Sequence, residues 1–121
     1  MEMCKEMHKL RSMLDARDIK WQDKSYITSP EQIAQCVTLG IEQKYADVSI
    51  FRTHFEVHGY FWSVINGFGT YGGYEPYTGK NKGLLELMSD MVNGGEPLGC
   101  LTAEDVCKII DSGGDISWMN V

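Results

Sequence analysis

Three side chains of types that commonly bind metal ions alternate in one short stretch of the sequence: His54, Glu56 and His58. Polar and apolar residues alternate around them, which predicts a β-strand with these three side chains on one face. Residues two apart on a strand lie roughly 6.6 Å apart, so a neighbouring pair could share an ion, but all three could do so only across a bulge. We favour a polar face on which Arg52, Glu56 and the histidines pair across strands, and keep a metal-dependent enzyme as an alternative.

The residues that follow this stretch form a long loop of glycine and tyrosine. Six of the eighteen residues in 66–83 are glycine, and aromatic residues recur at every third position: Phe68, Tyr71, Tyr74 and Tyr77. Tyrosine offers a large contact area at low entropic cost, as in protein-recognition loops. The same tyrosines could stack on a base while Arg52 or Lys80 holds phosphate. A third interpretation is a structural loop that packs its own aromatics.

Residues 67–72 also match the pattern G-x-G-x-x-G. In a dinucleotide-binding fold these glycines let the backbone approach a pyrophosphate at the start of a helix. No helix is predicted to begin at Gly72 and no βαβ unit surrounds it. The match therefore does not indicate a dinucleotide site.

Two helices and a short strand are predicted before the strand that carries His54, Glu56 and His58. Apolar residues at helical spacing indicate an amphipathic helix of about four turns: Met3, Met7, Leu10 and Leu14. Ile19 and Trp21 alternate with polar residues, as in a short strand over 19–22. Ser29 caps a second helix, with proline at its first position, which runs to about Lys44.

From Asp47 the pattern changes to a hairpin, with a two-residue turn at His58-Gly59. The register that follows pairs Val57 with Tyr60, Phe55 with Trp62 and Thr53 with Val64. A helix over 84–92, an extended segment over 98–101 and a last helix starting at the T-x-x-D sequence of Thr102 complete the chain, with Trp118 folding back onto the core. The predicted fold is a single α+β domain, 1–121, in which a small antiparallel β-sheet (central hairpin about 48–66) packs with three to four helices.

Composition narrows the function classes. The net charge of -6 and the pI near 4.9 argue against direct binding of nucleic acid, which needs clustered lysine and arginine. Neither a signal peptide nor a membrane span is expected from the sequence. Cys36 and Cys107 lie among apolar residues of predicted helices, so we expect reduced thiols and a cytoplasmic protein.

The stretch RTHFEVHGYFWSVINGFGTYGGYEPYTG, together with GLLELM and EPLGCLTAEDV, resembles small proteins carried by bacteriophages and mobile elements of gut bacteria. The resemblance runs from about Leu10 to Ile110. It implies an inhibitor of host defence in the host cell cytosol, similar to anti-CRISPR proteins, or a sponge that sequesters an immune signalling nucleotide. It implies no particular functional residues.

We therefore expect a non-enzymatic binding protein without a cofactor, which blocks a larger protein effector by direct contact. A nucleotide sponge is the first alternative and the metal-dependent enzyme the second, and a homo-oligomer is possible. The expected contact or ligand-binding residues lie on the polar hairpin face and in the glycine loop: Arg52, His54, Glu56, His58, Phe68, Tyr71, Tyr74, Tyr77 and Lys80.

Overall fold

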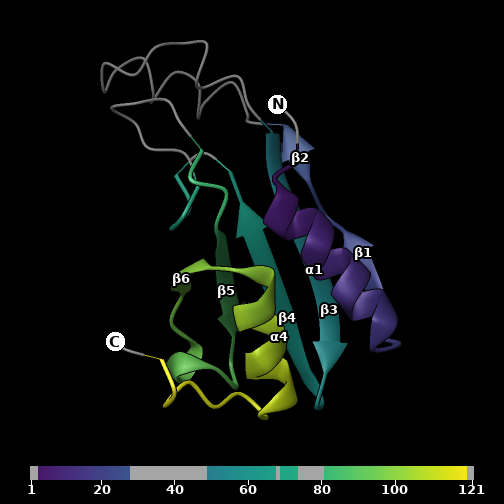
Figure 1. Ribbon diagram of the computed structural model, residues 1–121, viewed down its shortest axis with the longest axis vertical. Coiled ribbons are helices and arrows are strands. Elements are labelled where there is room, and N and C mark those ends of the chain that lie inside the picture. Colours follow the sequence, from purple (N-terminus) through teal and green to yellow (C-terminus); the bar gives the residue numbers. More distant parts are fainter. Residues whose placement is uncertain (1–2, 28–48, 68, 74–80, 120–121) are drawn as a thin grey trace.

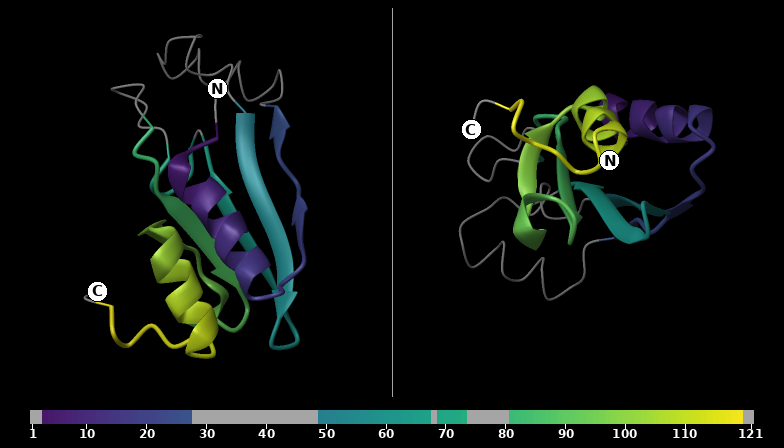
Figure 2. Two further views of the ribbon diagram at one scale, coloured as in Figure 1. Left: turned by 45° about the vertical axis from the view of Figure 1, so that its right-hand side comes forward. Right: turned by 90° about the horizontal axis from the view of Figure 1, so that it is seen from below.

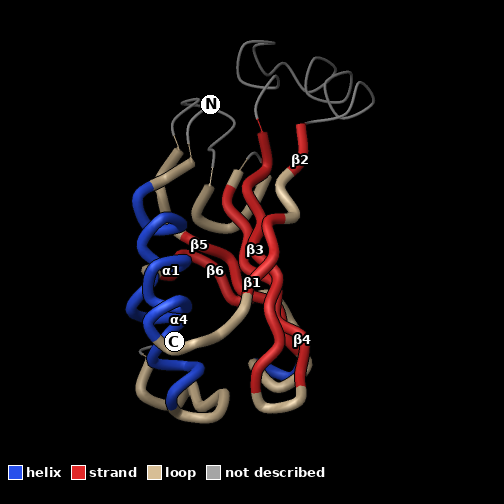
Figure 3. The backbone as a smooth tube through the Cα atoms, turned by 90° about the vertical axis from the view of Figure 1, so that its right-hand side faces the viewer, coloured by secondary structure: helices blue, strands red, loops and turns tan. Residues whose placement is uncertain are grey.

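Two α-helices cover one face of an antiparallel sheet in this computed structural model, which describes residues 3–27, 49–67, 69–73 and 81–119 (Figure 1). The helices are α1 (Lys5–Ala16) and α4 (Ala103–Asp111), and a short 3₁₀ turn, η1, spans Asn93–Gly95. Both α-helices lie on the same side of the strands (Figures 2 and 3). The described residues therefore form two layers, one of helices and one of strands.

Six strands make up the sheet in the described part of the chain. They are β1 (Trp21–Asp23), β2 (Tyr26–Ile27), β3 (Ser49–Val57), β4 (Tyr60–Asn66), β5 (Leu85–Ser89) and β6 (Leu98–Leu101). The order across the sheet is β1-β3-β4-β5-β6, and β2 pairs with β3 beyond the end of β1. Every pairing is antiparallel. Because β1 and β2 pair with successive parts of β3, they together form one interrupted edge strand beside it.

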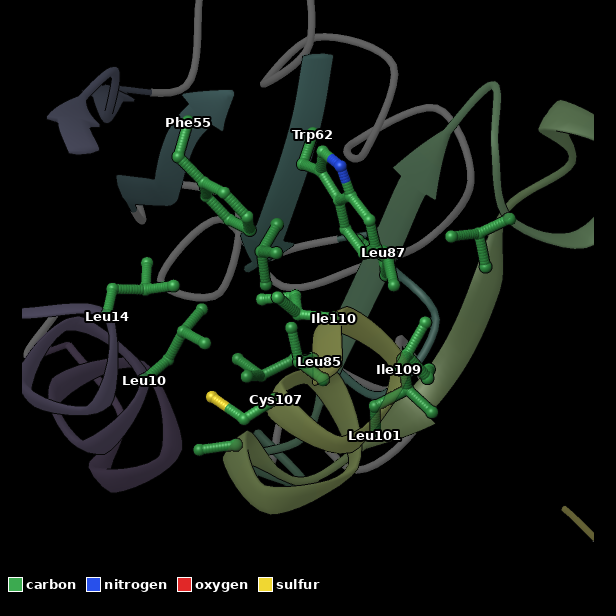
Figure 4. Close-up of a cluster of buried hydrophobic side chains, with 14 of the residues drawn as sticks. Leu10, Leu14, Phe55, Trp62, Leu85, Leu87, Leu101, Cys107, Ile109 and Ile110 are labelled. Carbon is green, nitrogen blue, oxygen red and sulfur yellow. The ribbon is translucent and has the colours of Figure 1, made fainter. Parts of the chain in front are cut away.

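The core lies between the helices and the sheet. Alternate residues of β4 and β5 point into it, and one stripe of each helix packs against them (Figure 4). Its fully buried side chains include Leu10, Leu14, Trp62, Leu87 and Ile109. Because α1 and α4 use their apolar stripes on the same sheet face, the opposite face has no helix over it among the described residues.

The central hairpin has the register that the alternation predicts. Val57 pairs with Tyr60 and Phe55 with Trp62, and the turn residues His58 and Gly59 have φ values of 57° and 77°. Two consecutive positive φ values are typical of the tight turn that matches the twist of paired strands. The prediction of a central hairpin is confirmed.

Both terminal helices are confirmed as well. The last helix begins with a capping box, in which the Thr102 hydroxyl accepts from the Asp105 N–H and the Asp105 carboxylate accepts from the Thr102 N–H. Trp118 packs against the core, as predicted, with the Lys108 ammonium 4.2 Å from its ring centre.

The prediction of three to four helices on the sheet is wrong. Residues 84–92, predicted as a helix, contain strand β5, which pairs with β4 on one side and β6 on the other. Leu85 and Leu87 are buried while Glu86 lies between them on the other face, a period of two. Leucine and methionine favour helices weakly, and pairing on both sides of the segment overrides that preference. The helix predicted from Ser29 to Lys44 lies outside the described residues.

Arg11 fastens helix α1 to the interrupted edge of the sheet. Its Nε donates to the Thr53 hydroxyl at 2.8 Å and its Nη2 to the Asp23 carboxylate at 3.1 Å. The guanidinium also lies 4.6 Å from the centre of the Trp21 ring. One arginine thus connects the helix with both β1 and β3, and it keeps the buried Thr53 hydroxyl hydrogen-bonded.

A pair of asparagines closes the neck of the glycine loop. Asn66 Nδ2 donates to Asn81 Oδ1 at 3.1 Å and to the Leu84 carbonyl at 2.8 Å, while Asn81 Nδ2 donates back to Asn66 Oδ1 at 2.8 Å. The Leu84 N–H donates to the Gly72 carbonyl, which adds a backbone bond to the neck. Asn66 is fully buried, so its amide depends on these partners.

Replacing Asn66 with leucine should lower the free energy of unfolding by about 1–3 kcal/mol, because the Asn81 amide and the Leu84 carbonyl lose their partners. Urea unfolding monitored by tryptophan fluorescence measures the change. Gln22→Leu, the same kind of replacement at an exposed position of β1, should change stability by less than about 0.5 kcal/mol. Equal effects of the two variants would contradict the role assigned to the asparagine pair.

Candidate protein-binding face

The sheet face opposite the helices is the candidate site, and we call it the outer face. Thr53, Trp62 and Leu87 point toward the helices and are buried, so the residues between them along each strand point away. Cross-strand pairing then places the outward residues of three neighbouring strands together: Arg52, His54, Glu56, Phe61, Ser63, Ile65, Glu86 and Met88. No described helix lies over these residues (Figures 2 and 3).

Large apolar side chains on this face are exposed to solvent. Phe61 is 57% exposed and Met88 46% exposed. The outward residues of the central strand β4 are Phe61, Ser63 and Ile65, none of which is charged. The middle of the outer face is therefore uncharged and largely apolar, which is typical of the centre of a protein–protein interface.

Tyr71 of the glycine loop joins the same face. Its N–H donates to the Glu86 carboxylate at 3.0 Å, and its carbonyl accepts from the Cys100 N–H at 3.1 Å. Its side chain is 64% exposed. Two contact regions that the sequence places far apart, the hairpin and the loop, are therefore next to each other on one surface.

A bulge in β6 makes room for Tyr71. Leu85 pairs with Leu101 and Leu87 with Leu98, so Glu86 lies opposite two residues, Gly99 and Cys100. Cys100 has a φ of 58°, a left-handed conformation that is uncommon for a residue other than glycine. A Cβ atom on Gly99 would lie 2.3 Å from the Tyr71 Cβ, so only glycine lets the loop lie against the sheet here.

Close packing also explains Gly72, the last glycine of the G-x-G-x-x-G stretch, and Gly73, which follows it. A Cβ on Gly73 would lie 2.0 Å from the Gly67 carbonyl oxygen, and one on Gly72, whose φ is 103°, would lie 2.9 Å from the Leu84 Cβ. The Thr70 hydroxyl also accepts from the Gly67 N–H. These glycines allow a tight turn onto β5 and β6, and the structure gives them a packing role.

His54 lies edge-on to the Phe61 ring, with ring centres 4.7 Å apart. Burial lowers the pKa of His54 below its ordinary value of 6.5, and the nearby charges of Arg52 and Lys24 lower it further. His54 is therefore neutral at pH 7. It extends the uncharged middle of the outer face by one strand.

Arg52 marks the side of the face that borders β1 and β2. Its guanidinium lies 5.2 Å from the centre of the Tyr26 ring, and its backbone N–H donates to the Ser25 hydroxyl at 3.1 Å. Its Nε is buried without a hydrogen-bond partner, and no carboxylate of the described residues lies within 4 Å of the guanidinium. Among the described residues, the Arg52 guanidinium therefore has a ring contact with Tyr26 and no ion pair.

His58 does not share the outer face with His54 and Glu56. It sits in the left-handed turn, and its Nε2–H donates to the Ile110 carbonyl near the end of α4 at 2.8 Å. The same carbonyl also accepts from the Gly113 N–H at 3.1 Å, so His58 adds a side-chain hydrogen bond at the end of the helix. His58 was predicted as a contact residue, but in the structure it connects the hairpin turn to helix α4.

The H-x-E-x-H stretch consequently does not assemble into one ligand set. Among the described residues, no group of three histidine, cysteine, aspartate or glutamate side chains is placed to hold a metal ion. Cys4, Cys100 and Cys107 are free thiols, and burial raises the pKa of Cys107. Four predicted contact residues lie outside the described part of the chain: Phe68, Tyr74, Tyr77 and Lys80.

A groove of about 540 Å³ borders the outer face where the chain from α1 diverges from β3. Its wall includes Lys20, Gln22, His54, Glu56 and Phe61. Beyond the pairing of Trp21 with Phe55, the strands β1 and β3 separate and leave this space. The groove extends the outer face past Phe61 toward the hairpin turn.

Sequence reasoning missed Met88, because the segment around it was predicted as a helix. It also missed Tyr26 and the link between Tyr71 and Glu86, which depend on contacts between distant parts of the chain. Phe61 was recognisable from its position opposite Glu56 in the predicted register.

Comparisons with known proteins add no relative: none of the family models, curated proteins or solved structures compared with the chain matches it. Within the described residues, no helix combines the length and the apolar character needed to cross a membrane.

Replacing Arg52 with glutamine should raise the pKa of His54 toward its ordinary value, because one nearby positive charge is removed. NMR titration of the imidazole resonances measures this. Lys24→Gln should raise the pKa by less, because its charge contributes less than that of Arg52.

The same pKa shift predicts a pH dependence of stability. In the unfolded chain His54 is protonated as the pH falls through about 6.5, whereas in the folded protein it is protonated only at lower pH. The free energy of unfolding should therefore fall as the pH drops below 6.5. His54→Gln should reduce this fall, whereas replacing the exposed His8 should leave it in place. An unchanged fall in the His54 variant would show that another group is responsible.

Proposed function

We propose that this protein is a non-enzymatic binding protein that acts by protein–protein contact through its outer face. The observation that carries the proposal is the exposure of Phe61, Met88 and Tyr71 on one side of the sheet. Contiguous exposed apolar residues with a polar border are typical of protein-interaction surfaces. The polar border here consists of Arg52, Glu56 and Glu86.

The partner in this proposal is a larger bacterial defence effector, met in the host cytosol. The resemblance to proteins of phages and mobile elements supports that partner class. The net charge of -6 supports a partner with a basic surface, because opposite charges speed the encounter and select among partners. The apolar middle of the face would then supply most of the binding free energy.

Replacing Phe61 with serine should weaken partner binding by about 30-fold or more, because an exposed aromatic at the centre of a contact contributes about 2 kcal/mol or more. Tyr60→Ser is the matched control: Tyr60 neighbours Phe61 on β4 and is 46% exposed, but its side chain points to the other side of the sheet. Immobilised wild type, Phe61→Ser and Tyr60→Ser are each incubated with lysate of a gut bacterial host, and retained proteins are quantified by mass spectrometry.

The expected partner is retained by the wild type and by Tyr60→Ser and is lost from Phe61→Ser. Titration calorimetry with the purified partner then measures the change in affinity. Equal retention by all three proteins would contradict the use of the outer face.

Arg52 supplies an observation in favour of a second candidate function, a nucleotide sponge. Its guanidinium lies against an aromatic ring and has no carboxylate partner among the described residues, so it could hold a phosphate. Cyclic dinucleotides and other cyclic oligonucleotides should then raise the unfolding temperature of the wild type, and Arg52→Gln should abolish the increase. No increase with any member of the panel would leave the protein-contact proposal alone.

A further inference from the structure

The charges on the outer face are arranged on opposite sides of its central strand. Arg52 of β3 pairs with Ile65 of β4 on one side, and Glu86 of β5 pairs with Ile65 on the other. Neighbouring strands are about 4.8 Å apart, so the two charged residues flank β4 at similar distances. Lys24 adds a second positive charge on the Arg52 side, close enough to lower the pKa of His54.

A face with a positive charge on one side of β4 and a negative charge on the other can pair with a second copy of the same face. A twofold axis parallel to β4, lying between two stacked copies, exchanges the positions on its two sides. The Arg52 of each copy then lies opposite the Glu86 of the other, and the uncharged residues of β4 meet in the middle. A contact of this type contains each charge pair twice.

We propose that the outer face binds a second copy of this chain, forming a twofold-symmetric dimer in which the sheets stack face to face. This inference rests on the proposed use of the outer face for protein contact, and it names the partner that the face meets in the absence of an effector. Phe61 and Ile65 are buried at the centre, and two Arg52–Glu86 pairs border them. The effector and the second copy compete for the same residues.

Both charged groups have bonding capacity left for this contact. The Arg52 guanidinium has no carboxylate within 4 Å among the described residues, and Glu86 uses one carboxylate oxygen for the Tyr71 N–H. Arginine forms strong, charge-assisted hydrogen bonds with carboxylates, so the guanidinium and the remaining Glu86 oxygen are suited to each other. Tyr71, beside Glu86, would face the side of the other copy that carries Lys24 and Tyr26.

The size of the face indicates a reversible dimer. Four or five strands spaced about 4.8 Å apart make a narrow surface, at the lower end of what stable complexes bury. Among the described outward residues on the Arg52 side, Glu56 is acidic. It pairs with Phe61 and is exposed, so it lies at the border of the contact, where its carboxylate stays in water. We expect dissociation to be measurable at micromolar concentrations.

Charge reversal tests the proposal. Arg52→Glu alone places acidic groups opposite each other twice, and Glu86→Arg alone does the same with basic groups. Each single variant should dissociate at least about tenfold more readily than the wild type, as measured by sedimentation equilibrium. The double variant Arg52→Glu, Glu86→Arg should dimerise to within a few-fold of the wild type. Lys9→Glu, on the helix side of the molecule, is the control and should dimerise normally.

A mixture of the two single variants is the sharpest form of the test. In a dimer of one Arg52→Glu chain and one Glu86→Arg chain, both charge pairs are complementary, so two weakly associating proteins should associate when combined. Circular dichroism of each variant establishes that it is folded. A monomeric wild type at millimolar concentration would overturn the proposal, and so would a dimer that neither single variant weakens or a mixture that stays monomeric.

The outcome is separable from that of the proposed function. A monomeric chain that captures an effector through Phe61 would overturn the dimer and support the proposed contact. A dimer whose Phe61→Ser variant still captures the same proteins as the wild type would support the dimer and overturn effector binding through this face.

Discussion

The pairing of β4 with a neighbour on each side is the constraint on which the rest of the structure depends. Strand β4 has seven residue pairs with β3 and four with β5. A shift of its register by one residue would turn every side chain of β4 to the other face of the sheet. Trp62 and Val64 are thereby directed into the core, and Phe61 and Ile65 away from it. One strand therefore decides which residues stabilise the fold and which form the outer face.

Local signals were sufficient where the structure is local. The hairpin register follows from the turn at His58-Gly59 and the alternation on either side, and the last helix follows from the capping side chains of Thr102 and Asp105. The segment 84–92 was mistaken for a helix because Leu84, Leu85 and Met88 also fit helical spacing. Pairing with β4 and β6, the strands before and after it in the chain, makes it a strand. The alternation of Leu85 and Leu87 with Glu86 fits a strand as well, so the segment alone does not decide between the two periods.

The candidate site was predictable to a similar degree. Arg52, His54 and Glu56 share a face, as their spacing indicates, but His58 leaves that face because its backbone turns into the left-handed region. Tyr71 reaches the face only through the bulge of β6 and the missing side chain of Gly99. The G-x-G-x-x-G pattern draws attention to the loop glycines, but in the structure they allow close contact with other parts of the chain. The sequence pattern alone does not distinguish this packing role from phosphate binding.

The arrangement of polar and apolar groups on the outer face suits the proposed binding role better than catalysis. Catalysis needs several polar groups converging on one point in a space that excludes water. On the outer face the polar groups stand apart, at the borders, and the middle is occupied by Phe61, Ile65 and Met88. His54 is held neutral beside Phe61, which extends the apolar middle and keeps the positive charge at Arg52 and Lys24. Separated charges around an aromatic centre suit the proposed protein contact, and in that contact the opposite signs on the two sides of β4 would determine the orientation in which the partner approaches.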